Sequence, residues 1–188
     1  MRKIKKFKIN LRKREVLRNL KLLSQVKEIT RQIEEMVDSE IKRSDEYITP
    51  ASVYSSFNED EIMIKFGASF FSEEGQKKPI TATFIIVSIG EQIENEIKKH
   101  RDSGEIIRSD VIRSIGIEAT ESALNFVHKL IEDEARREDA EVLAPEKLDI
   151  SKSIQIVNSL DSKKIGVYIN EKNQIQPEFS SVAVIKWK

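Results

Sequence analysis

The side chains that most often act as nucleophiles, bases and metal ligands are scarce in this chain of 188 residues. It contains no Cys and only two His, His100 and His128. Without a thiol, disulfides, cysteine nucleophiles and iron–sulfur ligation are excluded. Two imidazoles leave little for a zinc site or a catalytic triad. We expect His100 at the end of a helix, where an imidazolium suits the helix dipole, and His128 on a helix surface.

Carboxylates are abundant, but their spacing is typical of exposed helix faces rather than of a catalytic acid–base pair. Examples are Glu91, Glu94 and Glu96, and the run Glu132, Asp133 and Glu134. The chain has no Walker sequence, no Gly-x-Ser-x-Gly and no His-Glu-x-x-His, and its six Gly are too scattered for a phosphate-binding loop. These residue patterns alone therefore predict a soluble α+β domain and no particular reaction.

The formal charge of zero, from 32 basic and 32 acidic residues, hides an unequal distribution. Residues 1–21 contain ten Lys or Arg and one Glu, a charge of +9, so the remaining 167 residues carry −9. Such an arm predicts attraction to nucleic acid, a membrane surface, an acidic partner or the acidic remainder of the same chain. We favour a Lys-rich first strand and helix folded against the remainder. Nucleic acid is disfavoured because the arm has one aromatic residue, Phe7, and no binding motif.

Length and apolar runs indicate the general class of protein. A chain of 188 residues suits a single domain, 1–188, with the basic segment 1–21 included. No apolar run approaches the roughly 20 residues of a membrane-crossing helix. The basic N-terminus is not followed by an apolar signal core. We therefore expect a cytoplasmic protein with no membrane partner.

Apolar periodicity predicts an α+β fold with a largely antiparallel sheet. Helices are expected at 11–21, at about 25–43 with Ser24 as cap, between Gly90 and His100, at about 105–137, and after a cap at Asp149. Strands are expected at 7–9, 51–57, 62–66, 80–89, 164–169 and 180–187. Residues 58–60 are expected to form a hairpin turn, and 72–78 a polar loop.

Two of these elements are expected to organise the fold. Segment 80–89 is β-branched and almost continuously apolar, which is typical of a central strand covered on both faces. The long helix 105–137 has an apolar face on which Gly116 and Ala119 carry little or no side chain. Such a face permits the close approach of a sheet or of another helix.

Several short segments, taken together and in order, resemble one known family. They are KREVLRNL (13–20), FIIVSIGEQI (84–93), DVIRSIGIEATESA (110–123), LDSKKIGVYI (160–169), and Pro177 with the Ser-Val-Ala that follows it. In order and spacing they resemble the activation, or reactivation, domain of vitamin B12-dependent methionine synthase. The resemblance covers nearly the whole chain and implies an α+β fold with a curved, largely antiparallel sheet.

The resemblance also implies a function. Domains of this family bind S-adenosylmethionine in a shallow groove and dock on a cobalamin-carrying domain whose cobalt has been oxidised. A flavodoxin-like donor or another reductant supplies an electron, and S-adenosylmethionine supplies the methyl group that restores methylcobalamin. No cobalamin-binding region fits in this chain, so we expect a stand-alone subunit acting on a cobalamin-binding methionine synthase subunit. The alternative is a non-catalytic docking module of the same fold that has lost the S-adenosylmethionine site.

The family's ligand loop, Arg-x-x-Pro-Gly-Tyr or close to it, is altered here. The corresponding residues run from Val142 to Lys147; Ala144 and Pro145 match, whereas the Arg, Gly and Tyr are absent. A guanidinium can bind a ligand carboxylate bidentately, and Val142 cannot. Lys147 could replace it as a point charge.

Two further positions follow from the resemblance. Glu121 matches a helix acid that lies near the ligand in the family, where a carboxylate could pair with the ligand's ammonium. The family's Thr-Glu-Ser-Tyr becomes Asn-Glu-Lys-Asn at 170–173, so that Glu171 matches and the aromatic residue is replaced by Asn173. The residues expected to bind S-adenosylmethionine are thus Glu121, Val142, Ala144, Pro145, Lys147, Glu171 and Asn173.

Overall fold

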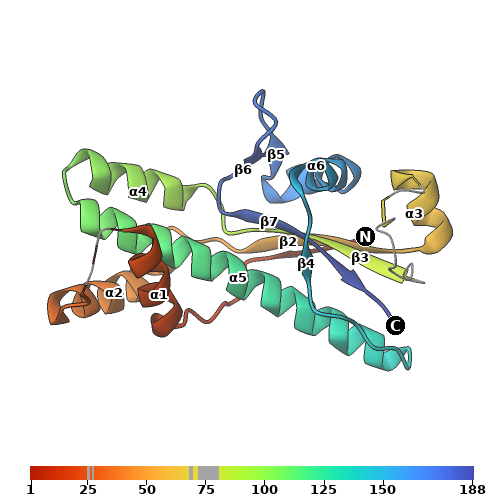
Figure 1. Ribbon diagram of the computed structural model, residues 1–188, viewed down its shortest axis with the longest axis horizontal. Coiled ribbons are helices and arrows are strands. Elements are labelled where there is room, and N and C mark those ends of the chain that lie inside the picture. The colour runs from red at the N-terminus through yellow and green to blue at the C-terminus, as the bar shows by residue number, and fades with distance from the viewer. Residues whose placement is uncertain (25, 27, 68–69, 72–80) are drawn as a thin grey trace.

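The computed structural model describes residues 1–24, 26, 28–67, 70–71 and 81–188, and its centre is a sheet (Figure 1). Five strands of the described chain form it, in the order β1 (Arg2–Lys5), β2 (Ala51–Asn58), β3 (Thr81–Ser88), β7 (Ser180–Lys186) and β4 (Glu146–Lys147). Two short strands, β5 (Tyr168–Ile169) and β6 (Ile175–Gln176), form a separate hairpin. Every neighbouring pair in the sheet is antiparallel, and the predicted α+β class is confirmed.

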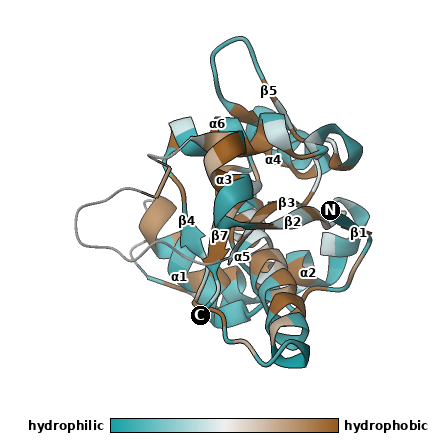
Figure 2. Ribbon diagram, turned by 90° about the vertical axis from the view of Figure 1, so that its right-hand side faces the viewer, coloured by the Kyte–Doolittle hydropathy of each residue, from teal (hydrophilic) through white to brown (hydrophobic). Residues whose placement is uncertain are grey.

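Helices lie on both faces of the sheet. One face carries α1 (Lys13–Leu23), α2 (Arg31–Arg43), α4 (Gln92–Asp102) and α5 (Ile106–Arg137), whose apolar residues share one core. The other face carries α3 (Glu59–Phe66) and α6 (Ile150–Ser159), which share a second core. Short 3₁₀ turns, η1 (Ser44–Glu46) and η2 (Ser162–Ile165), follow α2 and α6. Strand β3 and much of β7 are brown, and therefore apolar, between these layers (Figure 2).

Strand β3 is the central strand that its apolar sequence predicts. It pairs with β2 on one side and with β7 on the other, and residues 82–88 are all buried. Ile85 and Val87 belong to the core beneath α5, whereas Phe84 and Ile86 belong to the core beneath α6. This alternation explains why the strand is apolar at successive positions: both of its faces are covered.

Helix α5 lies close against its neighbours, as the small residues on its apolar face predict. A Cβ atom at Gly116 would lie 2.5 Å from a ring carbon of Phe179 and 2.9 Å from the Cδ1 of Ile93. Both neighbours are buried, so neither side chain can move aside easily. Gly116 therefore lets α4 and the segment before β7 pack directly on the backbone of α5.

The basic arm folds against the acidic remainder, as predicted, although its strand lies elsewhere. Strand β1 forms an edge of the sheet beside β2, whereas residues 7–9, the predicted strand, have no regular structure. Phe7 instead stacks on Phe126 of α5, with ring centroids 4.5 Å apart. Arg12 forms an ion pair with Glu118 at 2.8 Å, and Lys13 forms one with Asp38 at 2.8 Å.

The predicted hairpin at 58–60 is wrong, because the chain there begins helix α3. The side chain of Asn58 accepts a hydrogen bond from the Glu61 backbone N–H, and the Glu61 carboxylate accepts one from the Asn58 N–H, each at 2.9 Å. This capping box satisfies two free N–H groups at the helix start. The alternation at 62–66 does not mark a strand, since Ile62 is buried while Ile64 is 83% exposed.

Other helix boundaries differ in detail from those predicted. Ser24 ends α1, with its N–H donating to the Leu20 carbonyl, rather than capping the following helix. Thr30 caps α2, accepting from the Ile33 N–H at 3.4 Å. Asp149 caps α6 as predicted. Of the predicted strand 164–169, only 168–169 is extended, and the predicted loop at 72–78 lies outside the described residues.

Within the described part of the chain, no helix is both long enough and apolar enough to pass through a lipid bilayer.

Candidate functional site

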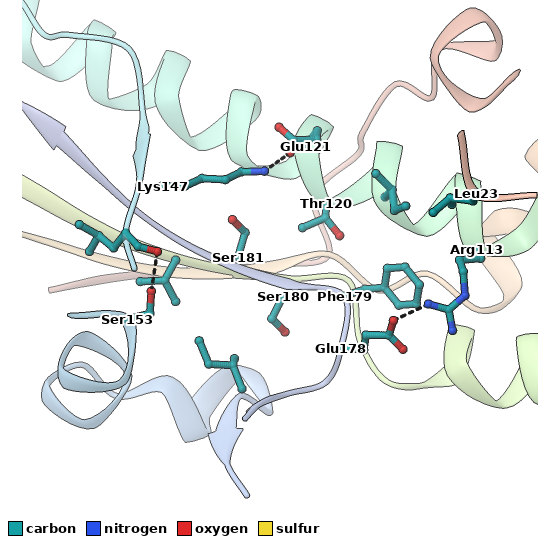
Figure 3. A pocket seen from close by; sticks show the side chains of 14 residues that line it. Leu23, Arg113, Thr120, Glu121, Lys147, Ser153, Glu178, Phe179, Ser180 and Ser181 are labelled. Atoms are coloured by element: carbon teal, nitrogen blue, oxygen red, sulfur yellow. Dashed lines mark hydrogen bonds and ion pairs between the residues drawn. The ribbon is translucent and has the colours of Figure 1, made fainter. Parts of the chain in front are cut away.

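A groove of about 390 Å³ lies along β7, between α5 and α6 (Figure 3). This volume falls within the range of small-molecule sites. Its wall residues come from α1, α5, the segment around β4, α6, β6 and the start of β7. They are Leu23, Arg113, Ile117, Thr120, Glu121, Lys147, Leu148, Ser153, Ile175, Glu178, Phe179, Ser180, Ser181 and Val182.

The groove follows from the shortness of β4. This strand has two residues, Glu146 and Lys147, which pair with 184 and 183 of β7. At 180–182, β7 pairs with β3 on its inner side, and the side away from β3 borders the groove (Figure 3). The segment that connects α5 to α6 therefore crosses β7 at one end of the groove and brings Lys147 to it.

Glu121 and Lys147, both predicted to bind ligand, meet across this groove. The Lys147 ammonium donates to Oε1 of Glu121, which joins the β4 segment to α5 (Figure 3). The Lys147 side chain is 62% exposed and that of Glu121 is 40% exposed. An ion pair this exposed contributes little to stability, so a ligand with its own charges can compete with it.

A second ion pair in the groove, between Arg113 and Glu178, was not predicted from the sequence. Arg113 donates to Oε1 of Glu178, and its guanidinium lies 5.9 Å from the centre of the Phe179 ring. The backbone N–H of Glu178 donates to Glu94 at 2.7 Å. Arg113 lies within the family-like segment 110–123 and Glu178 directly follows Pro177, but neither position carries a local signal that distinguishes it from an ordinary surface charge.

The hydroxyl groups of the groove differ in whether they have a hydrogen-bond partner within the protein. Thr120 donates to the Gly116 carbonyl at 2.9 Å, and Ser153 donates to the Leu148 carbonyl at 3.2 Å. The Oγ of Ser180 is buried and has no hydrogen-bond partner among the described residues. An unpaired buried hydroxyl is costly, so the Ser180 Oγ is a strained feature of the groove wall rather than an accessible ligand contact.

The other predicted ligand residues do not line the groove. Val142 forms a bridge with Trp187 and packs on the core beneath α5, Ala144 is exposed, and Pro145 is half-buried. Glu171 and Asn173 are exposed in the turn between β5 and β6, and this hairpin projects from the body of the molecule (Figure 1). The structure thus brings together two of the seven predicted residues, Glu121 and Lys147.

The two histidines lie away from the groove. His100 is in the last turn of α4, as predicted, and its Nδ1 lies 2.5 Å from Oε2 of Glu105. His128 is partly buried on α5, with Nε2 3.7 Å from Glu132. The described residues contain no cluster of three or more His, Asp or Glu that could hold a metal ion.

A scan of family models and a search of curated proteins give no match to this sequence. Among solved structures, the chain is similar to the crystal structure of the MetH reactivation domain bound to AdoHcy, with a TM-score of 0.59 and 9% sequence identity. The match covers 82% of this chain, which spans 64% of the length of that one. At this identity the likeness shows the fold alone, and that fold is the one implied by the short family-like segments.

Proposed function

We propose that this chain is a reactivation-type module that binds S-adenosylmethionine in the groove along β7. In this proposal it presents the methyl group to a cobalamin held by a partner, a methionine synthase subunit. One observation carries the proposal: a groove with paired, exposed charges occurs in a fold similar to that of a reactivation domain crystallised with AdoHcy.

The charges of the groove suit the amino-acid end of this ligand. That end is a zwitterion, with one ammonium and one carboxylate, and it needs one anionic and one cationic partner. Glu121 and Lys147 are already side by side, so the ligand exchanges one exposed ion pair for two. Lys147 acts as a point charge, which holds the carboxylate less directionally than an arginine would.

The remaining wall suits an adenosyl group. Leu148, Ile175 and Phe179 supply apolar surface, and Ser181 adds a hydroxyl to the wall of the groove. Small-molecule sites commonly combine an apolar wall with a few polar groups that fix orientation.

The module supplies position rather than acid–base or nucleophilic groups. Holding the sulfonium methyl close to its acceptor turns a bimolecular step into an effectively intramolecular one. The redox and methyl-accepting chemistry is that of the partner's cobalamin, with an electron from a flavodoxin-like or other reductant. The role as a stand-alone subunit, and the identity of the partner, belong to the proposal.

Calorimetric titration with S-adenosylmethionine and with AdoHcy tests ligand binding. We expect saturable binding to the native chain, weakened at least about tenfold in E121Q and in K147Q. The control is E35Q, which removes another exposed ion-pair acid, on α2 and away from the groove; the affinity of this variant should be unchanged. E171Q shows whether the β5–β6 hairpin contributes to binding, as the resemblance implies.

A recovery assay tests the function itself. An inactive cobalamin-dependent synthase is incubated with a reductant, S-adenosylmethionine and this chain, and the return of its activity is followed. We expect recovery that depends on both the ligand and the chain, and a smaller rate with E121Q. Failure to recover any synthase from the same genome would exclude the proposed function.

The changed loop 142–147 favours one alternative, a docking module that has lost its ligand site. This module would bind a corrinoid protein without S-adenosylmethionine. No heat in the titration, together with retained binding of a cobalamin-carrying protein, would support this alternative over the proposed function.

A further inference from the structure

A second cavity, of about 320 Å³, lies between the basic arm and α5. The arm contributes Lys8, Asn10 and Arg12, and α5 contributes Asn125, Phe126 and Lys129. None of the residues lining this cavity lines the groove along β7. The cavity is therefore a separate feature, on a different part of the surface of α5.

The lining of this cavity is strongly cationic. It contains three cationic side chains and no Asp or Glu, in a chain whose total charge is zero. Among the described residues, neither Lys8 nor Lys129 has an ion-pair partner or a hydrogen-bond partner for its ammonium. The third cation, Arg12, is paired with Glu118, so the two lysines without counter-charges supply the positive potential that attracts anions.

Arg12 is fixed in place and still has a donor to offer. Its Nε and Nη2 donate to the two oxygens of Glu118, at 2.8 Å and 3.2 Å. Glu118 is buried, with a side chain 2% exposed, so this pair holds the guanidinium firmly. The Nη1 group takes no part in the pair and can donate to a bound anion.

The cavity is bounded by contacts that hold the arm against α5. At one end, Phe7 stacks on Phe126 with an interplanar angle of 8°. At the other, the Ser122 hydroxyl donates to the Asn10 carbonyl at 3.0 Å, beside the Arg12–Glu118 pair. The cationic groups between these contacts are therefore carried by segments that are already in position before a ligand arrives.

We propose that this cavity binds the phosphate group of a small organic phosphate. A phosphate monoester offers three acceptor oxygens and up to two negative charges, and it forms strong charge-assisted hydrogen bonds with Lys and Arg. The amides of Asn10 and Asn125 add further donors. A volume of about 320 Å³ suits a small ligand rather than a polymer.

A nucleic-acid strand is a poorer occupant on these observations. Non-specific binding of single strands combines a long basic groove with aromatic platforms on which successive bases stack. The arm has one aromatic residue, Phe7, whose ring is already stacked on Phe126. The arrangement thus favours one compact anionic group.

Calorimetry at low ionic strength tests the proposal with inorganic phosphate, ribose 5-phosphate and ribose. We expect saturable binding of both phosphates, no binding of ribose, and affinity that falls as salt is added. K8Q and K129Q should each weaken phosphate binding at least about tenfold. The matched control is K98Q, an exposed lysine on α4, which should bind as the native chain does.

The outcomes are distinguishable from those of the proposed function. S-adenosylmethionine affinity should be unchanged in K129Q, because the two cavities share no lining residue. Thermal unfolding of each variant checks that the fold is kept. Absence of saturable phosphate binding, or equal affinity in K8Q, K129Q and the native chain, would overturn the proposal. Binding of a single-stranded RNA without binding of ribose 5-phosphate would overturn it in favour of nucleic acid.

Discussion

Glu94 shows how the surroundings of the groove set the properties of a single carboxylate. Burial raises its pKa, and the neighbouring carboxylates of Glu178 and Glu91 raise it further, against the opposing effects of the Glu178 N–H and Arg113. Its pKa is therefore higher in the folded than in the unfolded chain. Ionised Glu94 then carries a cost in the folded state, and this cost appears as the pH rises from the unfolded pKa of about 4.3 through the folded pKa.

We predict a pH-dependent gain in stability for E94Q. The neutral amide keeps an oxygen that can accept from the Glu178 N–H but does not ionise. Relative to the native chain, the free energy of unfolding of E94Q should therefore be higher near neutral pH than below about pH 4. Urea unfolding at the two pH values measures the difference. E91Q, which changes an exposed acid, is the control, and an E94Q difference that does not vary with pH would contradict the prediction.

Helix α3 shows how a few local contacts decide the type of an element. Its apolar residues alternate, which is typical of a strand, but it begins with the capping box of Asn58 and Glu61. Acidic residues fill its first turn, where they interact favourably with the helix dipole. These polar contacts, together with the single buried position Ile62, favour a helix over a second strand.

We predict that N58A lowers the free energy of unfolding by about 1 kcal/mol, because the side-chain cap is lost. N58D should be close to neutral, since a carboxylate oxygen can accept from the same Glu61 N–H. Urea unfolding of the two variants measures the contrast. Equal stability of N58A and N58D would show that the cap does not stabilise α3.

At the scale of elements, segments with a long, regular pattern were predicted correctly. Strand β3 and helix α5 each repeat one pattern over many residues, so local sequence and tertiary packing agree. Shorter segments were predicted less well. Residues 7–9 alternate between apolar and polar and were expected to form a strand, but the edge strand of the sheet is β1, at residues 2–5. In such short segments the few apolar residues fit both the strand period and the helix period. Packing against the rest of the molecule then determines which structure forms.

The positive arm, residues 1–21, is held to the negative remainder of the chain largely by contacts with α5. The central one is Glu118, buried on α5, which accepts from the Nε and Nη2 groups of Arg12. Arg2 reaches a second acid of α5, Glu134, whereas Lys13 reaches Asp38 of α2. The arm is thus part of the fold: Arg2, Arg12 and Lys13 form ion pairs with the remainder of the chain, and Lys8 lines the cavity described above.

We predict that E118A lowers the free energy of unfolding by about 2 kcal/mol or more, because several hydrogen bonds to a buried charge are lost together. E35A removes an exposed ion pair with Arg31 and should change stability by less than about 0.5 kcal/mol. Chemical denaturation of both variants gives the comparison. Similar small losses in the two variants would show that the buried contact does not anchor the arm.

The sequence by itself determined the α+β class, the central strand, the long helix and the unequal charge distribution, because each depends on patterns between near neighbours. Through a family resemblance it also suggested seven ligand residues, of which Glu121 and Lys147 line the groove. Only the tertiary structure decided that these two residues, 26 positions apart, face one groove with Arg113, Glu178 and Ser180. The reason is physical: the groove exists because β4 pairs with only two residues of β7, and no local pattern in the sequence encodes where a pairing ends. The same holds for the cationic cavity, which forms where the arm meets α5.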